Sequence, residues 1–291
     1  MSKETHPLAE IFGFPAENSS QAAQRYRSGK LCPFNNKVPN CTKDKANDPL
    51  GVCSIFHDGK TAITCPVRFR EDWIITIDSA GFFFSADTHW TSLTEVQLRD
   101  RNGKSAGNID IVLVAYDRDG QVVDFGAIEI QGVYISGNIR RPFEAFMKEP
   151  SSAEALQWRG EKHYPRPDYL SSSRKRLAPQ LLYKGGILHR WKKKTAVVLD
   201  HGFFESLPKL QEVPKKEADI AWLIYDLMED PQTQRFRLTL TRTVYTRFTD
   251  SLAQITVSEA GEVDEFVSVL QNKLDDKLNS EPVNQTLDET L

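Results

Sequence analysis

The chain has 291 residues, 40% of them hydrophobic, which is enough to bury the core of one large domain with an appendage. It holds no apolar run approaching the roughly 20 residues that cross a bilayer, and its first residues lack the apolar stretch of a signal peptide. We therefore expect a cytoplasmic protein with no membrane partner. The net charge of −3 argues against a surface coated in positive charge for binding nucleic acid.

The charge is unevenly distributed along the chain. Residues 250–291 contain ten acidic residues against two lysines, a net charge of −8, so residues 1–249 carry +5. A modest positive excess in the larger part of the chain is compatible with a polyanionic partner.

The hydrophobic pattern predicts an α/β chain (α+β, with a mixed sheet) in three parts. Residues 1–70 contain all the cysteines among turn-forming residues, residues 71–280 hold the core, and a polar tail at 281–291 is expected to be disordered. In chain order, we expect a strand at 73–78, a helix at 87–101, hairpin strands at 108–116 and 122–134, a helix at 177–191, strands at 195–199, 220–225 and 235–245, and an amphipathic helix at 263–274.

The four cysteines, Cys32, Cys41, Cys53 and Cys65, all lie within 34 residues. Because disulfides are disfavoured without a secretory signal, four thiolates around one iron or zinc ion explain this clustering best. Such a site would be structural, since four protein ligands leave no position open for a substrate. The alternative is four ordinary buried residues, because the spacing lacks close pairs of the C-x-x-C type.

Three polar residues interrupt the predicted hairpin. Asp110 stands in an otherwise apolar strand, and Glu129 and Gln131 lie two apart on the next strand, so they share a face. A carboxylate in such a strand is costly unless it is paired or binds a metal, which makes Asp110 and Glu129 candidate ligands of Mg²⁺. Mg²⁺ held by carboxylates is suited to phosphodiester hydrolysis. The alternative is that both carboxylates lie on the exposed face of an amphipathic sheet.

The order Asp110, then Glu129-Ile130-Gln131, resembles the D…(D/E)-x-K core of a nuclease superfamily, with glutamine in place of lysine. Together with the four preceding cysteines it resembles the NotI-type restriction endonucleases, which combine a D…E-x-Q site with an N-terminal four-cysteine metal site. The resemblance covers roughly residues 30–200. It implies a PD-(D/E)-x-K core and a bacterial type II endonuclease that cuts duplex DNA at a specific, palindromic and GC-rich sequence.

The resemblance also implies roles for individual residues. Asp110 and Glu129 would ligate Mg²⁺ with help from the main-chain carbonyl of Ile130. Gln131 would replace the lysine that orients the attacking water, although a neutral amide neither acts as a base nor stabilises charge as strongly. Glu95, on the predicted helix 87–101, corresponds to a glutamate that binds the metal or orients a water there. An exposed helix glutamate without a role is the alternative for Glu95.

Basic residues near the candidate site could contact DNA. They are Arg140 and Arg141, which follow the second hairpin strand, and the run Arg174-Lys175-Arg176. Any one of them alone is more often a solvated surface charge, and only together do they indicate a DNA-contacting surface. Cutting both strands of a palindromic site requires two subunits, so the mechanism and the resemblance imply a homodimer.

Other functions remain open at this point. One is a non-catalytic DNA-binding protein braced by its metal site, and another is a repair or recombination nuclease of the same fold that recognises DNA structure. A histidine-metal nuclease is less well supported, because the sequence lacks a His-Asn-His constellation.

Overall fold

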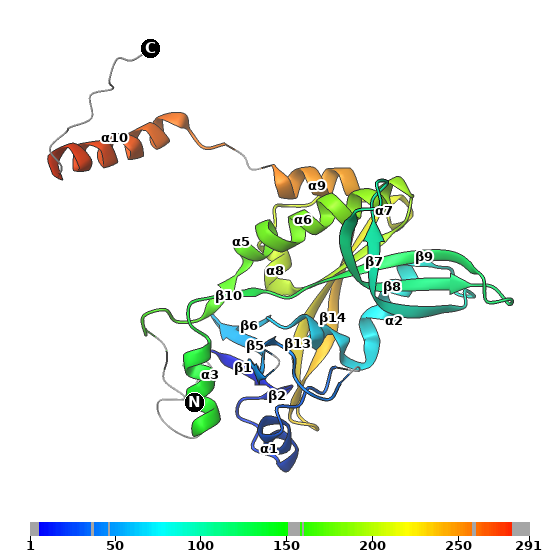
Figure 1. Ribbon diagram of the computed structural model, residues 1–291, viewed down its shortest axis with the longest axis horizontal. Coiled ribbons are helices and arrows are strands. Elements are labelled where there is room, and N and C mark those ends of the chain that lie inside the picture. The colour runs from blue at the N-terminus through cyan, green and yellow to red at the C-terminus, as the bar shows by residue number, and fades with distance from the viewer. Residues whose placement is uncertain are drawn as a thin grey trace. The chain divides into compact units, whose positions relative to one another are not determined.

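The computed structural model describes residues 6–35, 38–45, 47–150, 158, 160–257 and 260–280 (Figure 1). The chain divides into two compact units, Met1–Thr256 and Val257–Leu291. The tail predicted at 281–291 lies outside the described residues. In the parts that are described, no helix has the length and apolar character needed to span a membrane.

A six-stranded sheet forms the centre of the first unit. Its strand order is β14-β13-β12-β9-β8-β7, and β12 is parallel to both β9 and β13, whereas the other pairs are antiparallel. This mixed sheet confirms the predicted fold class. The strands are β7 (Trp90–Arg99), β8 (Ser105–Tyr116), β9 (Val122–Gln131), β12 (Thr195–Asp200), β13 (Ile220–Asp230) and β14 (Arg235–Thr246).

Both faces of this sheet are buried, because its central strands alternate between two hydrophobic cores. On β12, Ala196 and Val198 belong to one core, and Val197 and Leu199 belong to the other. A strand buried on both faces appears in the sequence as a continuous apolar run. The apolar runs of β12 and β13 therefore predicted these strands correctly.

Helices cover the two faces. On one face α2 (Ile74–Phe83) packs against β9, where a Cβ atom at Gly126 would come within 2.4 Å of the Phe83 ring. The other face is covered by a helical segment, Tyr169 to Arg190, and by α8 (His201–Glu205) and α9 (Phe248–Thr256). The other helices in the described parts of the chain are α1 (Gln21–Ser28), α3 (Arg140–Lys148) and α10 (Val263–Ser280), with 3-10 helices at Pro66–Trp73 and Lys215–Glu217.

The N-terminal segment forms a smaller sheet of order β2-β1-β5-β6. Its strands are β1 (Leu8–Ile11), β2 (Phe14–Pro15), β5 (Val52–His57) and β6 (Lys60–Ile63), and two short ladders pair β3 (Asp44–Lys45) with β4 (Asp48–Pro49) and β10 (Tyr134–Ser136) with β11 (Arg166–Asp168). The predicted division of the chain at residue 70 remains a prediction.

A buried network of charges joins the small sheet to the large one. The Arg68 guanidinium is 0% exposed, and its Nε and Nη1 donate at 2.9 Å to Oε2 of Glu10 and of Glu71, respectively. Its Nη2 donates to the carbonyl of Phe236 at 3.0 Å, and Glu71 accepts the N–H of Leu238 at 2.6 Å. Since Glu10 lies on β1 and Phe236 on β14, one cation fixes the two sheets together.

Two predicted elements are wrong. The run at 73–78 forms the start of α2 instead of a strand, and residues 90–99 form strand β7 instead of part of a helix at 87–101. The apolar run of α2 is too short for its period to distinguish a buried helix from a strand. In β7 the burial alternates with period two, so the helical spacing of Trp90, Leu93 and Val96 was coincidental. The hairpin, the later strands and the helices predicted at 177–191 and 263–274 are confirmed.

We expect Arg68→Met to lower the free energy of unfolding by about 3–5 kcal/mol, because it leaves the carboxylates of Glu10 and Glu71 buried without their cation. Urea unfolding followed by circular dichroism measures this. Arg237→Met is the control, since Arg237 forms an exposed pair with Asp72 at 3.6 Å, and its loss should change stability by less than about 1 kcal/mol. Equal effects of the two variants would contradict a joining role for Arg68.

Candidate active site

The hairpin of β8 and β9 brings the predicted carboxylates together. Its ladder pairs Ile111 with Ile128, a register that places Asp110 opposite Glu129. The Asp110 Oδ2 atom accepts the N–H of Ile130 at 2.7 Å, which fixes this carboxylate against the neighbouring strand. Glu129 is 3% exposed and Gln131 is 0% exposed. The prediction that these residues gather on one face is therefore confirmed, and the face is covered instead of solvated.

The helical segment that covers this face has an unusual backbone. It runs through α5 (Tyr169–Ser172), a π-helical turn at Ser173–Leu177, α6 (Ala178–Gln180), a second π-helical turn at Leu181–Gly185, and α7 (Gly186–Arg190). Pro179 lacks the N–H that an α-helix would use at that position, which is one reason for irregular turns here. Leu177, Leu181 and Leu188 are buried and anchor the segment to the sheet.

Two residues of this segment contact the site, and sequence reasoning missed both. The Lys184 Nζ atom lies 2.5 Å from Glu129 Oε2 and also donates to the carbonyl of Asn108 at 2.8 Å. The Gln131 side chain donates from Nε2 to Gln180 Oε1 at 2.5 Å. A signal was available, because Arg176, Gln180 and Lys184 stand four residues apart and so share one helical face.

Two buried oxygens of the site, Glu129 Oε1 and Gln131 Oε1, have no hydrogen-bond partner among the described residues. A buried polar atom left without a partner is costly and is often explained by an ion or a water at that position. The Glu129 Oε1 atom and the Asp110 carboxylate are hard donors of the kind that Mg²⁺ prefers, so this pair of carboxylates fits a magnesium ion.

Burial shifts the ionisation of both carboxyl groups. Desolvation, followed by the charge of Asp110, raises the pKa of Glu129 to about 8, and the Lys184 ammonium opposes the rise. Desolvation also raises the pKa of Asp110, against the N–H of Ile130 and the charges of Lys184 and Arg176. A site that holds two such carboxyl groups attracts a further cation.

Glu95 lies near these carboxylates, although the helix predicted to carry it is a strand. It stands on β7 between residues that pair with Ile111 and Ile109, which places it beside Asp110, and its charge contributes to the raised pKa of Asp110. Its backbone adopts φ +57°, a left-handed conformation that is uncommon for glutamate. Its side chain is partly exposed and pairs with Arg70 at 3.4 Å.

The four cysteines are all free thiols. Burial and the other thiols raise the pKa of Cys32 to about 11, with contributions from Cys65 and Cys41, and the pKa of Cys53 is raised by burial, Cys65 and Cys32. These mutual interactions mean that the thiols lie near one another. Within the described ranges, however, no group of three or more His, Cys, Asp or Glu side chains is arranged to hold a metal ion.

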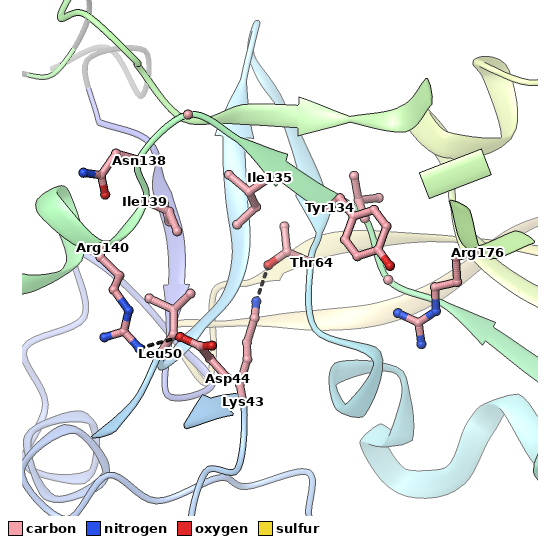
Figure 2. Close-up of a pocket in the computed structure, with 13 residues that line it drawn as sticks. Lys43, Asp44, Leu50, Thr64, Tyr134, Ile135, Asn138, Ile139, Arg140 and Arg176 are labelled. Carbon is pink, nitrogen blue, oxygen red and sulfur yellow. Dashed lines mark hydrogen bonds and ion pairs between the residues drawn. The ribbon is translucent and has the colours of Figure 1, made fainter. Parts of the chain in front are cut away.

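A cleft of about 560 Å³ begins where β9 ends, at Gly132 and Val133, directly after Gln131. Figure 2 shows Arg140 and Arg176 on opposite sides of this cleft. The charge of Arg176 acts on both Asp110 and Glu129, so the cleft adjoins the carboxylates. The other lining residues are Lys43, Asp44, Leu50, Thr64, Tyr134, Ile135, Gly137, Asn138 and Ile139.

The other candidate DNA-contacting residues differ in their surroundings. Arg140 is held by Asp44 at 2.5 Å and by Asp48 at 3.1 Å, contacts that tie α3 to the cysteine-containing segment. Arg141 lies over the ring of Trp158 at 4.8 Å. Arg174 and Lys175 are exposed on the same helical turn as Arg176.

Glu129→Gln should change how stability depends on pH in the metal-free protein. Because folding raises the pKa of Glu129 from 4.5 to about 8, the stability that its protonated form contributes is complete below about pH 4.5 and is lost as the pH rises through about 8. We expect the wild type to lose stability relative to the variant over this window, by at most about 1.4 kcal/mol per pH unit.

Urea unfolding in EDTA, from pH 5 to 8.5, measures this difference. Glu212→Gln is the control, because Glu212 is an exposed carboxylate paired with Arg242. A difference between wild type and Glu129→Gln that does not vary with pH would contradict the raised pKa.

Comparison with known proteins agrees with this geometry. The family model of restriction endonuclease NotI matches residues 18–238, a range that includes the four cysteines, the hairpin carboxylates and Lys184. No curated protein matches the chain. The match decides among the functions left open by the sequence, because it covers well over half of the chain. The chain therefore belongs to the NotI restriction endonuclease family and is a type II enzyme that cleaves double-stranded DNA at specific sites.

Proposed function

We propose that this endonuclease uses Mg²⁺ bound by Asp110 and Glu129. The observation that carries the proposal is the buried Oε1 atom of Glu129, which lies beside the carboxylate of Asp110 and has no hydrogen-bond partner in the described part of the chain. Restriction endonucleases generally use Mg²⁺, which neutralises charge on the scissile phosphate and activates the attacking water. The Ile130 carbonyl would complete the set of oxygen ligands.

The remaining residues of the site would position the reactants. Gln131 is held by Gln180 through its amide nitrogen, so its oxygen is left to accept a hydrogen bond from the attacking water. Glu95, beside Asp110 on β7, would orient a second water or bind the metal from the open side. Gln131 does not accept a proton in this arrangement, since its neutral amide only orients the attacking water.

DNA would approach along the cleft that adjoins the carboxylates. Arg176 fits a contact to the scissile phosphate or its neighbour, because it lines the cleft and acts electrostatically on both carboxylates. Arg174 and Lys175 are suited to more distant phosphates. Arg141 would also contact DNA. Arg140 would contact DNA while Asp44 and Asp48 hold its guanidinium in place.

We infer further that Cys32, Cys41, Cys53 and Cys65 bind one structural iron or zinc ion. The support is the chemistry of the donor set, four free thiols that interact electrostatically with one another. This module, within residues 1–70, would brace the β3–β4 ladder, and Arg140 contacts both strands of that ladder. On the same footing we propose a homodimer that acts on a palindromic, GC-rich site in the bacterial cytoplasm, with residues 71–280 as a PD-(D/E)-x-K core.

Purified protein with Mg²⁺ should cut a large sequenced duplex at one repeated sequence. Glu129→Ala should lower the cleavage rate by at least about 10³-fold, because it removes a metal ligand worth several kcal/mol of charge stabilisation. Mapping of the fragment ends gives the recognition sequence. Asp124→Ala is the matched control on the same strand and should cut at the wild-type rate. If the wild type leaves DNA intact with both Mg²⁺ and Mn²⁺, the catalytic assignment fails.

Elemental analysis of the purified protein should find about one iron or zinc ion per chain, as expected for four cysteine ligands. Cys53→Ser should lower both the metal content and the melting temperature, since a structural metal contributes directly to folding free energy. Thiol titration before and after adding a chelator provides the control, because bound thiolates react only once the metal is removed. Four thiols that react at once in a metal-free, folded protein would contradict the site.

A further inference from the structure

The E-x-Q pattern leaves the active site without the lysine that normally accompanies its two carboxylates. Gln131 is neutral, so it cannot balance the charge of Asp110 and Glu129 or stabilise charge that develops at the phosphate. A positive side chain from elsewhere in the fold would supply the missing charge. Lys184 is a cation that contacts Glu129; it is 5% exposed and lies on the helical segment that covers the site.

We propose that Lys184 is the active-site cation of this enzyme: it binds Oε2 of Glu129 from the covering helix, leaves Oε1 free for the metal, and supplies the positive charge that Gln131 lacks. This inference rests on the proposed function, since it assigns a positioning residue to the same site. Two acceptors fix the ammonium, Glu129 Oε2 at 2.5 Å and the carbonyl of Asn108 at 2.8 Å.

The positions of the unpartnered oxygens distinguish this role from a purely structural pair. A buried ion pair generally contributes less to stability than apolar residues of similar volume would. If Lys184 served stability alone, both oxygens of Glu129 would be expected to have partners, but Oε1 has none among the described residues. Gln180 likewise accepts a hydrogen bond from Gln131 Nε2, and Gln131 Oε1 has no partner among the described residues. The covering helix thus contacts Gln131 Nε2 and Glu129 Oε2, and within the described ranges it leaves Oε1 of each side chain without a hydrogen-bond partner.

The backbone of the helix explains how both contacts are made. Gln180 ends α6, and Lys184 lies in the π-helical turn that follows, one turn further along the same face. Such wide turns are rare in proteins, and many of those that occur lie at functional sites. Arg176, one turn earlier, lines the cleft beside the carboxylates. One helical face therefore carries a side chain for the phosphate, one for Gln131 and one for Glu129.

The test compares Lys184→Met and Lys184→Arg in the full-length protein. Lys184→Met should lower kcat by about 10²-fold or more, as expected for loss of one preorganised charged group. Lys184→Arg, which keeps the charge, should recover at least tenfold of that loss. The Mg²⁺ concentration for half-maximal rate should not rise in Lys184→Met, because removing a positive charge beside two carboxylates does not weaken their attraction for a cation.

A second measurement needs no catalysis. In the absence of DNA, Mg²⁺ should raise the melting temperature of Lys184→Met by more than it raises that of the wild type. The reason is that in the wild type the Lys184 ammonium already balances part of the negative charge of the site. Lys193→Met is the matched control, because Lys193 also pairs with a carboxylate of β9, Asp124, at 2.5 Å, but away from the site. It should match the wild type in both measurements.

The outcomes separate this inference from the proposed function. If Lys184→Met cuts within about threefold of the wild type while Glu129→Ala is inactive, Lys184 has no part in catalysis and the proposed function stands. If the wild type does not cut at all, the proposed function itself fails. Should Lys184→Met not fold, Lys184→Gln gives the same comparison, since it keeps a hydrogen-bond donor without the charge. A rise in the half-saturating Mg²⁺ concentration together with no rescue by arginine would also overturn the inference.

Discussion

The burial of one carboxylate, Glu129, constrains the rest of the active site. A charged group inside a sheet covered on both faces is tolerated only with cations at hand. Lys184 is one such cation, and Glu129 Oε1, which has no hydrogen-bond partner among the described residues, is available to a second. The hairpin register that sets Asp110 opposite Glu129 increases the need for positive charge, because the charge of Asp110 contributes to the raised pKa of Glu129. The proposed role of the site as a metal centre follows from this unbalanced charge.

Two layers of the fold, the large sheet and the helical segment that covers it, contribute side chains of different chemistry to the site. The strands carry the acceptors Glu129 and Gln131, whereas the covering helical segment carries Lys184 and Gln180, which contact them. Neither layer makes a site alone, because strand residues two apart in sequence can share a face but cannot neutralise one another. The Arg68 network acts at a distance from this chemistry. It fixes the N-terminal sheet to β14, and the N-terminal segment in turn contributes Lys43, Asp44 and Thr64 to the cleft.

Much of the site could be predicted from the sequence, and the part that could not depends on tertiary contacts. Asp110, Glu129 and Gln131 lie close in sequence within a hairpin, and their departure from an apolar pattern marks them. Lys184 lies far along the chain among many other lysines, and only the packing of its helix distinguishes it from a solvated one. The strand that carries Glu95 was mistaken for a helix because three apolar residues happened to fall at helical spacing, while the true period of two appears only with burial.

The parallel pairing of β9 with β12 has a consequence for biosynthesis. Glu129 pairs with Val197 across this ladder, and the segment with Lys184 is the connection between the two strands. Chains emerge from the ribosome from the N-terminus, and parallel pairings between distant segments form late because a long connection must close first. A chain synthesised only as far as β9 therefore carries Asp110, Glu129 and Gln131 but not yet Gln180 and Lys184, which contact two of them. These polar side chains are covered only once the segment that connects β9 to β12 has been made.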